Sequence, residues 1–190
     1  MALPAVANGA IALPPVEVTA AGHGRHWSSH RLVDSTLGTR LLHRAHHVTR
    51  EGAWHVLTVE LHDPDTGLAA EAVYRSPDGV PALRAEVTLR NEGADTLHLE
   101  SVTSLTLGGI TDIELDTADV WWAGNDWLAE FRWQRRPLRA ALPQLGGRVE
   151  YGYGKGSFAI AGQGTWSSCG HLPMGALYDR ASGGAWVWQF

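Results

Sequence analysis

Cysteine and lysine are almost missing from this chain. The single cysteine, Cys169, cannot form an internal disulfide, so the chain is not a small secreted domain held together by disulfides. Lys155 is the only lysine, and 15 basic residues stand against 20 acidic ones, for a formal net charge of −5. This charge balance argues against a nucleic-acid-binding protein, which needs a basic surface for the phosphates.

Long apolar runs are missing as well. No stretch reaches the roughly 20 apolar residues that a membrane helix needs. Residues 1–16 are apolar, but they lack a basic beginning and contain three prolines, unlike a signal peptide. We therefore expect a cytoplasmic protein without a membrane partner. With 190 residues, the chain is also too short for a (β/α)8 barrel enzyme.

No window of about a dozen residues shows the 3.6-residue period of an amphipathic helix. A period of two is present instead. Apolar side chains occupy every second position in residues 84–90 and, within the segment 54–62, in residues 57–62, and residues 96–107 carry four leucines at odd positions. Such alternation is typical of half-buried strands in antiparallel sheets.

The segments between these strands are rich in turn-forming residues, and the whole chain contains 22 glycines and 9 prolines. Three turns are expected, at 63–67, 76–79 and 91–95, with Gly67 at a positive φ. Two further strands are expected at 175–178 and 185–188, hinged at 182–184. The sequence therefore predicts an all-β fold, an antiparallel β-sandwich with little helix, in a single domain spanning residues 1–190.

Motifs for catalysis are missing. The chain has 20 acidic residues, but no pattern nominates the carboxylate pair that a glycosidase needs. His43, His46 and His47 are close in sequence, yet a strand would point His46 and His47 to opposite faces, which favours surface histidines over metal ligands. There is neither a nucleophile elbow nor a phosphate-binding loop. We expect no catalytic residue, no metal and no cofactor.

Tryptophan is the most frequent aromatic residue, with nine copies against four tyrosines and three phenylalanines. Residues 119–139 hold Trp121, Trp122, Trp127 and Trp133 together with four arginines, without clean alternation, so this segment is expected to be loop-like. Flat aromatic rings beside polar groups suit the apolar faces of sugars. Tryptophan and arginine also dominate protein interfaces, so core or interface packing remains an alternative.

The order of these elements resembles the N-terminal β-sandwich domain of family-36 glycoside hydrolases, the bacterial α-galactosidases or melibiases. The resemblance runs from about residue 40 to the end of the chain. Residues 63–106 are similar to that domain's strand–hairpin core, and residues 175–190 look like its closing strands before the catalytic barrel.

This resemblance implies a supersandwich followed by a (β/α)8 catalytic barrel in the full-length enzyme, which hydrolyses terminal α-galactosides with retention. The chain ends within an apolar strand at 185–190, as expected for the first domain of a longer protein. The implied partners are its own catalytic barrel, the α-galactoside substrate and further copies of the chain. Without the barrel, the chain is expected to be inactive.

One site carries over from the family. In several members, an aromatic loop of this domain reaches the mouth of the barrel, where a tryptophan contacts galactose. Asn125-Asp126-Trp127 resembles that loop, which implies substrate contact by Trp127 first, and by Asp126 and Asn125 beside it. The pair His26-Trp27 is a further candidate for a substrate-side or oligomer contact.

Two other functions remain open from the sequence. A stand-alone carbohydrate-binding β-sandwich could use the surface from Trp121 to Trp133 for sugars. A protein-interaction domain could use the same tryptophans as an interface, and would expose a large apolar patch when isolated.

Overall fold

A computed structural model describes residues 14–24, 35–107, 115–143, 158–162 and 164–190. Of these described residues, 54% lie in strands and 6% in helices, and the paired strands run antiparallel. The predicted all-β antiparallel fold with little helix is therefore confirmed. Contacts group the chain into two compact units, residues 1–108 and 109–190. Within the described ranges, no helix has the length and hydropathy needed to cross a membrane.

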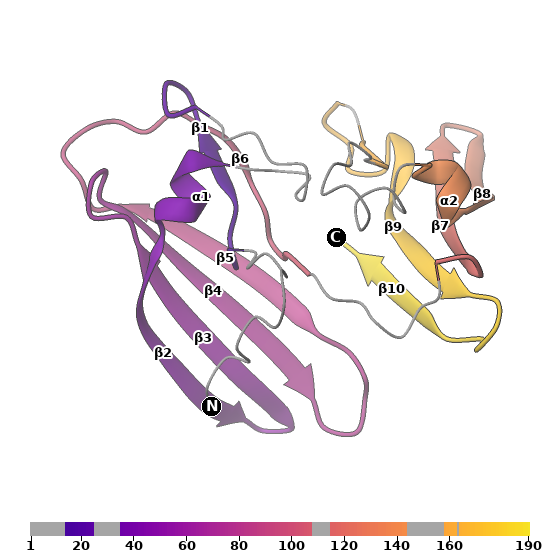
Figure 1. Cartoon of the computed structure of the whole chain (residues 1–190), viewed down its shortest axis with the longest axis horizontal. Coiled ribbons are helices and arrows are strands. Elements are labelled where there is room, and N and C mark those ends of the chain that lie inside the picture. The colour runs from indigo at the N-terminus through magenta and orange to yellow at the C-terminus, as the bar shows by residue number, and fades with distance from the viewer. Residues whose placement is uncertain (1–13, 25–34, 108–114, 144–157, 163) are drawn as a thin grey trace. The chain divides into compact units, whose positions relative to one another are not determined.

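The first unit is built on a four-stranded meander in the order β2-β3-β4-β5 (Figure 1). Its strands are β2 (Leu42–Glu51), β3 (Trp54–His62), β4 (Leu68–Pro77) and β5 (Arg84–Asn91). The strands predicted at 54–62 and 84–90 are confirmed. Strand β2 shows no apolar alternation because nine of its ten residues are exposed, so neither of its faces is covered.

One face of this meander carries the apolar side chains. Its first row is Leu61, Ala70 and Leu89, and its second row is Val59, Ala72 and Val87, each taken from β3, β4 and β5 in register. These residues pack in one core with residues of β1 (Val18–Ala20) and α1 (Thr36–Arg40), which lie over one end of the sheet (Figure 1).

The segment 96–107 forms less strand than its alternating leucines predict. Only β6 (Leu99–Val102) is extended and paired, and all four of its residues are exposed. The reason is the partner: β6 pairs with β1 alone, which has three residues and an irregular register between Thr19 and Ala20. Because β1 is short and pairs with only one edge of β6, the residues around β6 have no strand to pair with, and neither face of β6 is covered.

The second unit is a four-stranded sheet in the order β10-β9-β7-β8 (Figure 1). Its strands are β7 (Ala118–Asp126), β8 (Ala129–Pro137), β9 (Gly170–Asp179) and β10 (Ala185–Gln189), and β8 leads into the short helix α2 (Leu138–Ala141). The two strands predicted near the end of the chain are confirmed as the hairpin of β9 and β10.

Most of the segment 119–139 is a β-hairpin with one register shift between Gly124 and Asp126, so the expectation of a loop was wrong. Strands β7 and β8 pair from Asp119 opposite Pro137 to Asp126 opposite Ala129. Alternation is hidden because both faces of β7 are partly covered: Trp121 and Trp122 are consecutive and both half-buried. A strand covered on both faces has no polar face to produce a period of two.

Candidate functional site

The consecutive tryptophans Trp121 and Trp122 pack inside the second unit. The ring of Trp122 meets Phe158 edge to face, with 5.0 Å between centroids. The ring of Trp121 meets Tyr178 in the same way at 6.4 Å, and the guanidinium of Arg135 lies 5.7 Å from the centroid of Trp121. These contacts assign both tryptophans to packing, one of the two alternatives left open by the sequence.

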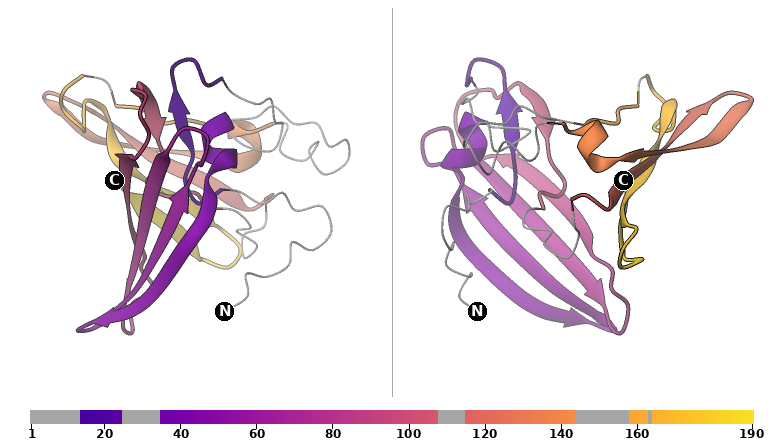
Figure 2. Two further views of the ribbon diagram at one scale, coloured as in Figure 1. Left: turned by 90° about the vertical axis from the view of Figure 1, so that its left-hand side faces the viewer. Right: turned by 45° about the vertical axis from the view of Figure 1, so that its right-hand side comes forward.

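The other end of the hairpin leaves large apolar side chains in solvent. We define the hairpin tip as residues 125–132. Trp127 is 77% exposed and Leu128 is 84% exposed, and the ring of Phe131 is also exposed. Figure 2 shows the hairpin of β7 and β8 projecting beyond the other strands of its sheet. Exposed apolar groups gathered in one place are typical of a binding surface.

The backbone of the hairpin tip is strained at two of these residues. Leu128 has a φ of 60° and Phe131 a φ of 53°, in the left-handed region. This conformation costs a residue with a Cβ about 1–2 kcal/mol. The backbone N–H of Leu128 donates to a carboxylate oxygen of Glu130 at 3.1 Å, which helps to hold the turn. Strained backbone carrying exposed apolar groups is a feature of functional sites.

A second exposed tryptophan faces the hairpin tip from another segment. Trp166, which is 64% exposed, precedes β9 and lies with its ring centroid 6.4 Å from that of Trp127. The two ring planes are inclined by 44°. We call this pair, Trp127 and Trp166, the aromatic platform. No local sequence pattern marks Trp166 for this role, because only the pairing of β7 with β9 brings the two segments together.

Asn125, the last-ranked of the three predicted contact residues, uses its amide inside the protein. Its Nδ2 donates to the carbonyl oxygen of Ser168 at 2.9 Å. Its Oδ1 accepts from the backbone N–H of Phe131 at 3.3 Å. Asn125 thereby links the segment before β9 to the hairpin tip, and its side chain is half-buried.

Asp126 lies at the surface beside Trp127, where it forms an ion pair with Arg132 across the hairpin. Both side chains are about half exposed, with 51% and 52% of their surface accessible. Gly124 lies under the arginine: a Cβ there would come within 3.3 Å of a guanidinium nitrogen of Arg132. Carboxylate acceptors and guanidinium donors are therefore available next to the aromatic platform.

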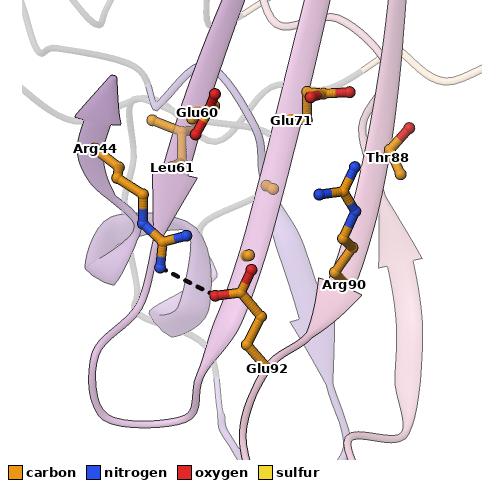
Figure 3. Close-up of a pocket in the computed structure, with 9 residues that line it drawn as sticks. Arg44, Glu60, Leu61, Glu71, Thr88, Arg90 and Glu92 are labelled. Atoms are coloured by element: carbon orange, nitrogen blue, oxygen red, sulfur yellow. Dashed lines mark hydrogen bonds and ion pairs between the residues drawn. The ribbon is translucent and has the colours of Figure 1, made fainter. Parts of the chain in front are cut away.

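The first unit offers a different kind of site, a shallow pocket on the polar face of the meander (Figure 3). Arg44 and Glu92 form an ion pair of 3.0 Å at this pocket. The hydrogen bond from Arg44 lowers the pKa of the Glu92 carboxyl. The described residues that line the pocket also include Glu60, Glu71 and Arg90, and none of them carries an aromatic ring. The pocket therefore lacks the flat apolar surface on which a sugar ring would lie.

The histidines of β2 lie at the surface. His46 and His47 occupy successive strand positions, opposite Val59 and Thr58, as the alternation argument predicts. The rings of His43 and His46 come together, with 3.2 Å between Nε2 and Nδ1. Among the described residues, no group of three or more His, Cys, Asp or Glu could hold a metal ion. His26 and Trp27 lie outside the described residues.

Comparison with known protein families gives one match. A model of the glycosyl hydrolase family 36 N-terminal domain matches residues 1–149, which include the whole hairpin tip. A search of curated proteins found no match. The matched range covers most of the chain and agrees with the resemblance in the strand and turn motifs of residues 63–106. The chain therefore belongs to the family of N-terminal domains of glycosyl hydrolase family 36.

Proposed function

We propose that this chain is the non-catalytic N-terminal domain of a retaining α-galactosidase. In this role, it packs on a (β/α)8 catalytic barrel, supports contacts between copies of the enzyme and shapes the entrance to the substrate site. The observation that carries the proposal is the hairpin tip, an exposed aromatic turn in a chain of a glycoside hydrolase family.

We place the two catalytic carboxyl groups on the barrel and not on this chain. Retaining glycosidases use two carboxyl groups about 5–5.5 Å apart, one of which must keep its proton near neutral pH and so has a raised pKa. The carboxyls of Asp63, Glu92 and Asp179 in this chain have lowered pKa values, the opposite of what a catalytic acid needs.

The proposed contribution of the hairpin tip is to bind the sugar. The indole of Trp127 offers a flat surface for the C–H face of galactose. Asp126 and Arg132 can exchange their mutual ion pair for hydrogen bonds with sugar hydroxyls, since both remain half exposed.

Kinetics of the enzyme that contains both the domain and the barrel test this function. Trp127→Ala should raise KM for an α-galactoside such as melibiose about tenfold, equivalent to ~1.4 kcal/mol of lost binding. The matched control is Trp54→Ala, because Trp54 is also exposed, at 40%, but belongs to the first unit. A Trp127→Ala enzyme with unchanged KM would contradict the proposed substrate contact.

A stand-alone carbohydrate-binding module is the second candidate, because both rings of the aromatic platform are mostly exposed on this chain. Calorimetric titration of the isolated chain with galactosides separates the two. Saturable binding by the chain alone would favour the module. Absence of binding, with activity that requires the barrel, would favour the domain role.

A further inference from the structure

The aromatic platform joins two segments that are far apart in sequence. Trp127 lies in the turn of the hairpin, and Trp166 lies before β9, outside the range matched by the family. Both rings are mostly exposed, so their contact with each other buries only part of each surface. The remaining ring faces are available to a ligand.

The geometry of the platform limits how a sugar ring can lie on it. Apolar groups pack at about 4 Å, so a pyranose held between two parallel rings would need them ~8 Å apart. The centroids of Trp127 and Trp166 are 6.4 Å apart, and the planes are inclined by 44°. A pyranose therefore does not fit between the rings, but it can lie across the open side of the pair and touch both.

Asn125 has the position and the bonds needed to hold this arrangement. Its Nδ2 binds the carbonyl oxygen of Ser168, two residues after Trp166, and its Oδ1 binds the N–H of Phe131. The segment itself is closed by a hydrogen bond of 3.0 Å from the N–H of Cys169 to the carbonyl oxygen of Trp166. One amide thus connects the segments that carry the two rings.

We infer that Trp166 is a second sugar-contact residue and that Asn125 is the positioning residue that aligns it with Trp127. This inference rests on the proposed function, because the ligand is the pyranose ring of the α-galactoside. A polar pair, Asp126 and Arg132, flanks the platform and favours a hydroxylated ligand over a purely apolar protein surface. Because the hydrogen bonds of Asn125 hold the two segments together, the rings need little ordering on binding.

The alignment can be tested on the chain itself by circular dichroism. Two indole rings at this distance and inclination couple their electronic transitions and produce a paired band in the far ultraviolet. Trp127→Phe and Trp166→Phe should remove the same band, whereas Trp54→Phe should leave it intact. A band that survives Trp166→Phe would overturn the pairing.

Asn125→Asp tests the positioning role selectively. The aspartate keeps an oxygen to accept from Phe131, but it replaces the donor to Ser168 with a second acceptor, which repels that carbonyl. We expect the paired band to weaken while the secondary structure and the unfolding midpoint change little. An unchanged band in this variant would overturn the role of Asn125.

Kinetics of the enzyme with its barrel then test the ligand. Trp166→Ala should raise KM for the α-galactoside about tenfold with little change in kcat, as expected for lost binding. An increase for Trp127→Ala but not for Trp166→Ala would overturn this inference and leave the proposed function standing. No increase for either variant would contradict both. A Trp166→Ala enzyme with a normal KM but a lower unfolding midpoint than the Trp54→Ala enzyme would identify a protein contact and overturn the sugar assignment.

Discussion

The hydroxyl of Ser35 donates to a carboxylate oxygen of Glu17 at 2.5 Å, and both residues are buried. The backbone N–H of Ser35 donates to the same oxygen at 3.2 Å. Ser35 is also the N-cap of α1, since its Oγ accepts from the N–H of Gly38. One serine thus ties the start of α1 to the residue before β1, and a buried carboxylate depends on it.

We expect Ser35→Ala to destabilise the first unit by about 2 kcal/mol, because it removes a helix cap and a charge-assisted hydrogen bond together. Urea unfolding should show a lower midpoint with an unchanged slope. The control is Thr39→Ala, since the Thr39 hydroxyl makes an exposed bond to the carbonyl oxygen of Thr36. Equal effects of the two variants would contradict the importance of the buried Glu17–Ser35 contact.

Gly67 provides a test of close backbone approach. It has a φ of 74°, and a Cβ on it would overlap the backbone nitrogen of Gly93. Gly79 has a φ of 71°, but nothing lies within 4 Å of the corresponding position. We expect Gly79→Ala to cost about 1 kcal/mol from backbone strain alone and Gly67→Ala at least ~2 kcal/mol. Similar unfolding midpoints for the two variants would show that the backbones at Gly67 and Gly93 can move apart without a loss of stability.

Asp179 makes the second unit sensitive to acid. Hydrogen bonds from Ser182 and Thr117, together with the N–H of Ala181, lower the pKa of its carboxyl from 3.8 to about 2. Because the folded-state pKa is the lower one, this stabilisation is complete above pH 3.8 and is lost as the pH falls toward 2. Asp63, whose pKa is also lowered, acts in the same direction in the first unit.

Asp179→Asn should therefore reduce the dependence of unfolding on pH in that window. The measurement is the urea midpoint of the second unit's transition at pH 6 and at successively lower pH values, for the wild-type chain and the variant. The two curves should approach each other as the pH falls. Parallel curves over the whole range would show that Asp179 does not contribute through its charge.

A variant at Leu128 tests how much the left-handed backbone of the hairpin tip costs in stability. Glycine adopts a φ of 60° without steric cost, and the Leu128 side chain buries almost nothing in this unit. We expect Leu128→Gly to stabilise the chain by about 1 kcal/mol. Leu83→Gly, at an exposed position without a positive φ, should instead destabilise it by about 0.5–1 kcal/mol. A destabilised Leu128→Gly chain would show that the side chain, and not the backbone, governs this position.

Local patterns were sufficient for much of the fold. The alternation in residues 54–62 and 84–90 identified β3 and β5, because a strand with one covered face must alternate. The turns were equally readable: Gly67 has the positive φ that its place in the turn requires. The family, too, followed from motifs within residues 63–106.

Features that depend on a distant partner could not be read in this way. β2 has no apolar face, and β6 is short because β1 is short. Strand β7 was hidden because both of its faces are partly covered, whereas β8 is almost entirely exposed, and in neither strand does a period of two remain. The pairings of β1 with β6 and of β7 with β9 join distant parts of the chain, and no short window of the sequence contains either of them.

The same division applies to the candidate site. The sequence by itself determined that tryptophans gather around residue 127 and that Asp126 and Asn125 stand beside them. Only the tertiary structure decided which of them face solvent, that Asn125 turns inward to Ser168, and that Trp166 completes the platform. The physical reason is that side-chain identity is local, whereas exposure and ring geometry are set by the register of β7 against β8 and β9.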